Sequence, residues 1–509
     1  MLTRAATHRL PFNHLMLSRL LKGAGIVVGI GIVGAALLYL AGMRIVLYGG
    51  GTPHFEFVST ADSQAAEVAR HREAQRAAPS VPAAVTPLSS PGTAAPSRGH
   101  SIGADGAPAS TSRIAGKLDD PRPAGSAYWT GFRGPHRNGT YDQQPIQTAW
   151  PSGGPRLLWK QPIGGGYASF AIARGRAFTI EQRGAREVVS AYDVQTGREL
   201  WTNEWTATFR ESMGGDGPRA TPAWADGRVF ALGGTGELRS LDEATGRVLW
   251  RTNILEDAGA PNLQWGMAAS PLIVDDTVVV LPGGSGGRSV VAYSRAEGKR
   301  AWSALDDQPS YSSPMLTEIN GVRQIVVFSA ARVVGLTPVT GEVLWEYPWK
   351  TDYDVNASQP VIVSGNRVLL SSGYGHGAVM LEVTRADPTW SVREVWRNIR
   401  MKNQFSTSLL HEGYIYGFDE SILACLDAAT GDVKWKGGRY GYGQVILASG
   451  HLIVLTESGE LVLVRATAEG HQELVRVPAI DGKTWNHPAI SDGYLLIRNS
   501  TEMAAFDLR

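Results

Sequence analysis

Two kinds of hydrophobic pattern divide the chain. Between Gly23 and Met43 the sequence has 21 residues without a charge, close to the ~20 that cross a bilayer as a helix. From residue 126 to Arg509, by contrast, short runs rich in β-branched and aromatic residues alternate with Gly-containing turns. Such runs are typical of β-hairpins. The pattern therefore predicts one membrane helix followed by an all-β domain.

A ten-residue unit recurs in the β-rich part. In Leu241 to Trp250, an apolar residue and Asp are followed by two spacers, Thr-Gly, two more spacers, an apolar residue and Trp. The same unit ends at Trp201 and Trp435. Weaker copies end at Trp302, Trp345 and Trp396. From Trp159 onward the successive Trp spacings are 42, 49, 52, 43, 51 and 39 residues, which is the length of a four-stranded propeller blade.

One hairpin precedes each unit, and eight can be counted. The last one is followed by Met503 to Leu508, which begins the next strand but lacks the Trp-containing half. The missing half stands at the start of the domain, as Arg156 to Lys160. We therefore expect an eight-bladed β-propeller that closes by pairing its N- and C-terminal strands, which removes the open edge. The hairpins start near Tyr167, Arg219, Ala268, Tyr311, Ala357, Phe405, Tyr442 and Trp485.

The residues of the repeat have structural explanations. Gly in a turn adopts positive φ at low cost, and Asp or Thr can bond the turn backbone. We interpret Asp193, Asp242 and Asp427 as turn-fixing residues rather than catalytic carboxylates. One Trp per blade is expected to pack against the neighbouring blade.

The region before the propeller is predicted in three parts: a cytoplasmic segment (residues 1–22), a transmembrane signal anchor (23–43) and a Pro/Ala/Ser-rich linker (44–125), with the propeller over 126–509. Four cations precede the span and one closely follows it, which leaves the N-terminus in the cytoplasm. The expected location is the inner membrane, single-pass, with the propeller in the periplasm or outside. The alternative for the span is a buried core helix. Within the linker, Ala61 to Arg76 is a candidate helix, and disorder is expected from about Ala77 to Gly125.

The amino-acid composition limits the kinds of ligand and site that the chain can have. The formal net charge is +1 and 19% of residues are charged, so no strong field favours nucleic acid. Cys425 is the only cysteine, which excludes an intrachain disulfide; it is expected to be a small buried strand residue. The histidines have no metalloprotease spacing. No catalytic residue and no metal ligand is assigned.

The repeats resemble those of the PQQ-like (quinoprotein-type) eight-bladed propellers. The resemblance covers Trp129 to Arg509, and the stretch Phe132 to Gly139 is similar to the opening of a large group of uncharacterised bacterial PQQ-like repeat proteins. The family includes PQQ-dependent alcohol dehydrogenases and the propeller lipoprotein of the outer-membrane barrel assembly machinery. The dehydrogenase branch implies PQQ, a calcium or lanthanide ion, a catalytic Asp and often a disulfide between adjacent cysteines. With Cys425 alone that disulfide cannot form, so no cofactor is assigned and PQQ enters only through the resemblance.

The residues at which the hairpins start also predict a ligand-binding site. The residue three before Pro222, Pro271, Pro314, Pro360 and Pro488, or its equivalent, is aromatic in five of the eight hairpins and Arg in one. Because the first strand of each blade lines the central channel, these positions should form a ring at one mouth, suited to a planar or anionic ligand or a peptide. The alternative is a plug of mutually packed side chains. The candidate ligand-binding residues are Tyr167, Arg219, Trp265, Tyr311, Asn356, Lys402, Asn403, Phe405, Tyr442, Trp485 and Asn486.

The functional prediction is a membrane-anchored, exported propeller, monomeric, that acts as a binding or assembly scaffold for envelope proteins or peptides. The alternative is a PQQ-dependent or vestigial dehydrogenase with a quinone at the channel mouth. A third interpretation is a sensor of polysaccharides or small molecules. Whether the protein is an enzyme is left open, with a non-enzyme favoured.

Overall fold

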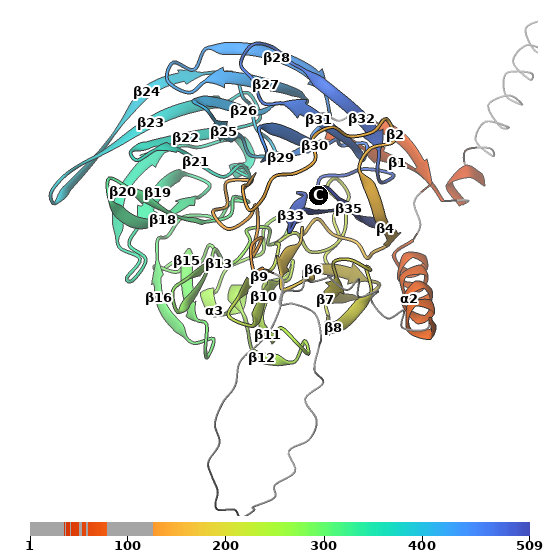
Figure 1. Cartoon of the computed structure of the whole chain (residues 1–509). Coiled ribbons are helices and arrows are strands. Elements are labelled where there is room, and N and C mark those ends of the chain that lie inside the picture. The colour runs from red at the N-terminus through yellow and green to blue at the C-terminus, as the bar shows by residue number, and fades with distance from the viewer. Residues whose placement is uncertain (1–34, 36, 41, 50–52, 58–59, 79–125) are drawn as a thin grey trace, which may run out of the picture.

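The computed structural model describes residues 35, 37–40, 42–49, 53–57, 60–78 and 126–509 (Figure 1). The predicted segment 1–22, most of the predicted span and linker residues 79–125 lie outside these ranges. In the part of the chain that is described, no helix is both long enough and apolar enough to cross a membrane. Met43, the predicted last residue of the span, begins a β-strand. The transmembrane helix of the predicted fold therefore has no support in the structure, and the predicted domain boundaries stay a prediction.

Eight sheets follow one another around a central channel and form a ring (Figure 1). Each contains four antiparallel strands, and the seventh gains a short fifth strand. At most junctions the first strands of neighbouring sheets contact one another, which places them around the channel. The predicted all-β, eight-bladed propeller with four-stranded blades is confirmed.

The first four blades contain the following strands. Blade 1 has β5 (Ala171–Ala173), β6 (Arg176–Arg183), β7 (Arg186–Asp193) and β8 (Glu199–Thr206). Blade 2 has β9 (Ala223–Ala225), β10 (Arg228–Leu232), β11 (Glu237–Asp242) and β12 (Val248–Asn253), and helix α3 (Ile254–Ala258) follows it. Blade 3 has β13 (Leu272–Val274), β14 (Thr277–Val280), β15 (Val290–Ser294) and β16 (Arg300–Ala304). Blade 4 has β17 (Met315–Ile319), β18 (Val322–Phe328), β19 (Arg332–Leu336) and β20 (Val343–Pro348), followed by the 3-10 turn η2 (Asp352–Asp354).

The other four blades complete the ring. Blade 5 has β21 (Val361–Ser364), β22 (Arg367–Ser372), β23 (Gly377–Ala386) and β24 (Thr389–Asn398). Blade 6 has β25 (Leu409–His411), β26 (Tyr414–Asp419), β27 (Ile422–Asp427) and β28 (Val433–Arg439). Blade 7 has β29 (Gln444–Ala448), β30 (His451–Leu455), β31 (Glu460–Arg465) and β32 (Glu473–Pro478), with β3 (Thr140–Tyr141) parallel to β29. Blade 8 has β33 (Ala489–Ser491), β34 (Tyr494–Arg498), β35 (Glu502–Asp507) and β4 (Arg156–Pro162).

The hydrophobic core lies between blades rather than within one. Phe178 and Val189 of blade 1, for example, share a buried cluster with Val229 and Leu241 of blade 2. The two middle strands of each blade are covered on both faces, which is why they are apolar along most of their length. The outermost strands alternate partly buried and exposed positions, as in β8. Cys425 is buried in β27, as predicted.

The Trp that ends most repeats packs against the glycine turn of the next blade. Trp201 Nε1 donates to the carbonyl of Glu243 at 2.8 Å, and a Cβ on Gly246 would lie 2.4 Å from the Trp201 ring. Gly246 also has φ +70°, so this turn requires glycine on both counts. The predicted packing of each Trp against its neighbour is confirmed. The same contact joins Trp159 to Gly197, Trp250 to Gly298, Trp302 to Gly341 and Trp396 to Gly431.

The Asp residues of the repeat hold these turns. Asp193 Oδ1 accepts hydrogen bonds from the backbone N of Thr196 at 2.9 Å and from its hydroxyl at 2.8 Å. Asp242 makes the same pair of bonds with Thr245, and the hydroxyl bond holds the pKa of Asp242 below its usual range. Asp427 accepts from the backbone of Ala429 at 2.8 Å. The predicted turn-fixing role is confirmed.

Blade 8 is built from both ends of the domain. Strand β4 pairs antiparallel with β35, from Pro162 opposite Glu502 to Arg156 opposite Asp507. The predicted closure is confirmed.

A hairpin and a helix precede the propeller, within the stretch predicted as a linker. Strands β1 (Met43–Leu47) and β2 (Pro53–Phe57) pair with each other, and α2 (Ala61–Ala77) confirms the predicted helix. Arg72 of α2 is 2% exposed and donates to Gln161 Oε1 and to the carbonyl of Pro162, both at 2.9 Å. Its Nε lies 3.4 Å from Glu199 of blade 1. Helix α2 therefore bridges the closure strand β4 and the neighbouring blade.

Candidate functional site

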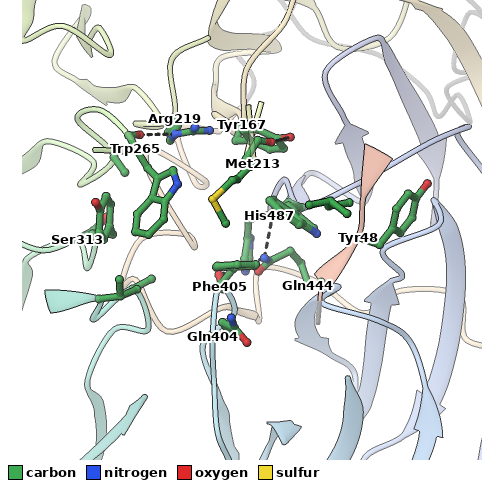
Figure 2. A pocket seen from close by; sticks show the side chains of 18 of the residues that line it. Tyr48, Tyr167, Met213, Arg219, Trp265, Ser313, Gln404, Phe405, Gln444 and His487 are labelled. Carbon is green, nitrogen blue, oxygen red and sulfur yellow. Dashed lines mark hydrogen bonds between the residues drawn. The ribbon is translucent and has the colours of Figure 1, made fainter. Parts of the chain in front are cut away.

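The segments that lead into the innermost strands converge at one end of the central channel. A cavity of about 430 Å³ opens there, and its walls are mostly apolar and aromatic (Figure 2). Six predicted residues line this cavity, and together they define what we call the channel mouth. They are Tyr167, Arg219, Trp265, Tyr311, Phe405 and Trp485.

The aromatic side chains form two groups at the mouth. The Phe405 and Trp485 ring centroids lie 4.7 Å apart, and Tyr167 lies 5.6 Å from Trp485. The Trp265 and Tyr311 centroids lie 5.5 Å apart. All pairs are tilted, as aromatic quadrupoles prefer. Each of these five side chains is only half-buried, so part of its surface is free to contact another molecule.

Arg219 holds the mouth loops together. Its Nε donates to the carbonyl of Trp265 at 2.5 Å and its Nη2 to the carbonyl of Gly215 at 3.0 Å. The guanidinium carbon lies 5.1 Å from the Tyr167 ring centroid, and Glu211 is 3.8 Å away. Burial lowers the pKa of Arg219. This cation therefore positions Trp265 and Tyr167, and the nearby Glu211 carboxylate offsets part of its charge.

The floor of the cavity is closed by the stretch that follows Trp129. Phe132 and His487 lie at the floor with their ring centroids 5.6 Å apart. Next to them Arg133 donates to the carbonyl of Thr407 at 3.2 Å, and Arg137 donates to the carbonyl of Pro314 at 2.8 Å. Burial lowers the pKa of both guanidinium groups to about 9. These two arginines cross-link several blades from inside the channel.

The structure places four predicted site residues away from the cavity wall. Asn356 is buried and donates to the carbonyl of Ser329 at 2.9 Å. Asn486 is buried and donates to Ala168 at 3.0 Å, whereas Lys402 Nζ lies 2.7 Å from Glu420. Asn403 is also buried, 2.8 Å from the Ser408 hydroxyl. These polar side chains stabilise the loops that carry the aromatic residues.

Tyr442, the remaining predicted residue, does not line the cavity but packs against Phe405, which does. Its ring centroid lies 5.6 Å from that of Phe405, and its side chain faces Gly49 of the N-terminal segment. Burial raises the pKa of Tyr442 to about 12. Tyr442 therefore belongs to the rim rather than to the cavity wall.

Several lining residues were not predicted. His487 precedes Pro488, and the equivalent position provides a hydroxyl in Thr221 and Ser270, whose backbone-to-hydroxyl bond of 2.9 Å joins blades 2 and 3. The residue before each proline therefore recurs along the sequence, and this recurrence could have indicated that His487 lies at the channel. Gln444 donates to the carbonyls of Phe405 and Trp485, with no pattern in the sequence to indicate it. The other unpredicted lining residues include Leu47, Tyr48, Gly49, Phe132, Met213 and Gln404.

The mouth does not fit PQQ. A planar tricarboxylate needs several uncommitted cationic donors, and a quinoprotein site also needs acidic metal ligands. Among the described lining residues Arg219 is the one permanent cation, and it already donates to two backbone carbonyls. Across the described ranges, no group of three or more His, Cys, Asp or Glu side chains is arranged to hold a metal ion. The donor set thus suits an apolar or aromatic ligand better than a quinone carboxylate with its metal.

Known proteins share the sequence pattern and the fold. A family model described as outer membrane protein assembly factor BamB matches residues 185–437. Proteins of that name are similar in Bordetella pertussis (22% identity over 324 residues, 55% of this chain and 78% of the relative) and in Burkholderia pseudomallei (26% over 243 residues, 46% and 58%). The predicted resemblance to PQQ-like eight-bladed propeller repeat proteins is confirmed.

Two solved structures have the same fold. The quinohemoprotein alcohol dehydrogenase from Comamonas testosteroni is similar with a TM-score of 0.55 at 13% identity, over 75% of this chain and 80% of that one. A europium-containing methanol dehydrogenase is similar with a TM-score of 0.54 at 14% identity, over 74% and 90%. At these identities the likeness shows the fold alone.

The predicted localisation is wrong. It placed the chain in the inner membrane as a single-pass protein because of the uncharged run from Gly23 to Met43. The similar proteins carry the name outer membrane protein assembly factor, and no helix in the described ranges could span a bilayer. An uncharged run can meet the length criterion for a span without indicating which membrane a protein serves.

Proposed function

We propose that this protein is a protein-binding scaffold of the cell envelope that acts in outer-membrane assembly and holds a segment of a partner protein at its channel mouth. Its similarity to proteins named outer membrane protein assembly factor supports the assembly role. The partner class is a protein because the mouth offers aromatic and apolar surface with a few oriented polar groups.

The observation that carries the proposal is the partial exposure of the mouth aromatics. Tyr167, Phe405 and Trp485 pack with one another yet remain only half-buried around a 430 Å³ cavity. The ring is already fastened by the Trp residues of the repeats and by Arg133 and Arg137 inside the channel. Large aromatic side chains that blade packing does not need are typical of the centre of a protein interface.

Site-specific photo-crosslinking in cells tests this function. A photoreactive residue at Met213, which lines the cavity and is 54% exposed, is compared with one at Val339, 79% exposed in the outer turn of blade 4. We expect adducts with outer-membrane assembly proteins from position 213 and none from position 339. Equal adduct patterns at both positions, or adducts with unrelated proteins only, would refute the proposal.

A further inference from the structure

The N-terminal segment of the chain covers the channel mouth. Strand β1 ends at Leu47, and Leu47, Tyr48 and Gly49 form part of the cavity wall. We propose that the mouth is a binding site for an extended polypeptide segment, and that Leu47 to Gly49 is a resident occupant of its rim which the partner segment displaces. This inference rests on the proposed function and names the kind of partner.

The contact between this segment and the rim is of the kind that peptides make. The backbone N of Gly49 donates to Glu457 Oε1 at 2.5 Å. The same oxygen accepts from Trp485 Nε1 at 2.7 Å, while Glu457 Oε2 accepts from the backbone N of Tyr442 at 3.2 Å. The carboxylate is thus held in place by the rim and presents a fixed acceptor to a main-chain N–H. Main-chain hydrogen bonds give affinity that does not depend on the side chains of the bound segment.

Steric contacts at the rim add selectivity. A Cβ on Gly49 would lie 1.5 Å from Cδ2 of Tyr442, far inside van der Waals contact. A segment that follows the path of residues 47–49 therefore needs glycine where its chain passes Tyr442. The partner segment is expected to carry glycine next to a bulky apolar or aromatic residue.

The resident segment leaves the cavity below it unfilled. Tyr48 donates its hydroxyl to Glu56 of β2, so its polar end is directed at the hairpin. Figure 2 shows Tyr48 on the opposite side of the view from Trp265 and Arg219. The cavity of 430 Å³ is large enough for a Tyr or Trp side chain. A partner segment can therefore gain contacts that the resident one does not make.

The hairpin is also weakly held. Ile45, Phe55 and Phe57 are 61%, 71% and 68% exposed. A second cavity, of 930 Å³, separates the hairpin from blades 8 and 1. A two-stranded hairpin is marginally stable when few side chains cover it, so its displacement costs little compared with filling the cavity.

Peptide binding by the full-length protein tests the inference. The substitution Gly49→Val forces the segment away from Tyr442. The matched control Gly365→Val introduces the same side chain into open space at a turn without positive φ. The probe is a fluorescein-labelled peptide with the sequence of residues 44–51, followed by fluorescence anisotropy. We expect the Gly49→Val protein to bind at least tenfold more tightly than the parent and the control.

Two further variants locate the binding. Tyr48→Ala, which removes the bond to Glu56, should also raise the affinity for the labelled peptide, as Gly49→Val does. Glu457→Gln added to Gly49→Val should lower the gained affinity at least fivefold. Equal affinity in parent and Gly49→Val, no binding by any variant, or binding insensitive to Glu457 would each overturn the inference. Intact crosslinking from position 213 together with absent peptide binding would refute this site and leave the proposed function standing.

Discussion

The outer part of the ring and the channel mouth use aromatic residues in opposite ways. At the outer contacts most of the Trp residues that end a repeat meet the glycine turn of the next blade, and the indole N–H then has a backbone acceptor, as Trp201 has in Glu243. At the mouth the equivalent position changes from Tyr167 to Ala268 to Trp485, and the aromatic rings stay half-buried. The repeated aromatic residues hold the blades together, whereas the variable ones at the mouth keep part of their surface accessible.

The contact between blades 4 and 5 is an exception that keeps the structural role of the outer Trp. Trp345 of blade 4 has no Thr-Gly turn to meet, because β23 and β24 extend into a long hairpin instead (Figure 1). Its Nε1 donates to Gln324 Oε1 of its own blade at 2.5 Å. An outer Trp thus keeps a buried acceptor even where the repeat is lost.

The largest effect is expected from opening the ring. Deleting Pro155 to Gln161 removes most of β4 and exposes the edge of β35. Because the last blade then has no outer strand and α2 loses its hydrogen bonds to Gln161, we expect the free energy of unfolding to fall by about 5 kcal/mol or more, comparable to the whole stability of a domain. Urea unfolding followed by circular dichroism measures this free energy.

The control for this deletion shortens an exposed hairpin. Removing Ala386 and Thr389, which pair with each other at the end of β23 and β24 and are exposed, leaves the ring closed. It should change the unfolding free energy by about 1 kcal/mol or less. If the β4 deletion melts like this control, closure does not stabilise the ring.

The next largest effect is expected at one outer contact. Trp250→Ala removes a buried ring and the bond to the carbonyl of Arg295. The free energy of unfolding should therefore fall by about 3–5 kcal/mol. Gly298→Ala places a Cβ 2.7 Å from the Trp250 ring and should destabilise through the same contact. The double variant should be less destabilised than the sum of the two single variants, because the two residues touch. Additive free energies in urea unfolding would show that the Trp and the turn act independently.

Stability should also depend on pH through one contact between blades 1 and 2. Glu187 is buried, its Oε1 accepts from the backbone N of Gly234 at 2.8 Å, and burial raises its pKa to about 7. In the unfolded chain a Glu titrates near ~4.3. Between these values the folded protein keeps a proton that the unfolded chain has lost, so stability falls as pH rises through this window and levels off above it.

Glu187→Gln should abolish that decline. We expect the variant to gain on the order of 2 kcal/mol over the parent at pH 8 and almost nothing near pH 4. Urea unfolding at several pH values measures the gain. The exposed Glu318→Gln serves as the control, and a gain of equal size at pH 4 and pH 8 would rule out the titration of Glu187 as its cause.

The sequence predicted the ring well because blade packing is local and repeated. The spacing of the Trp residues and the turns of Asp193 and Asp242 specify the blade, and the divided blade at Arg156 and Asp507 specifies the closure. Each of these features depends on residues that are close in sequence or recur at a fixed interval.

The mouth was predicted only in part because its contacts join distant segments. Tyr167, Phe405 and Trp485 were found from their register before the innermost strands. Gly49, by contrast, lies 408 positions from Glu457, and no periodic signal relates the two. Polar residues near the mouth, such as Asn486, were predicted as ligands but satisfy the carbonyls of neighbouring loops. Sequence alone does not tell which of these two roles a buried amide has.

The smallest effect on stability is expected at the mouth itself. Phe405→Ala removes a half-buried ring beside the cavity, so the unfolding free energy should fall by only about 1 kcal/mol. Binding of the labelled peptide to the Gly49→Val protein should nevertheless weaken at least tenfold, because Phe405 contacts both Tyr442 and Trp485 at the rim. Trp250→Ala should show the reverse, with a large loss of stability and unchanged affinity at temperatures where it stays folded. If Phe405→Ala is destabilised as much as Trp250→Ala, the mouth aromatics are part of the structural core, and their partial exposure does not mark a binding surface.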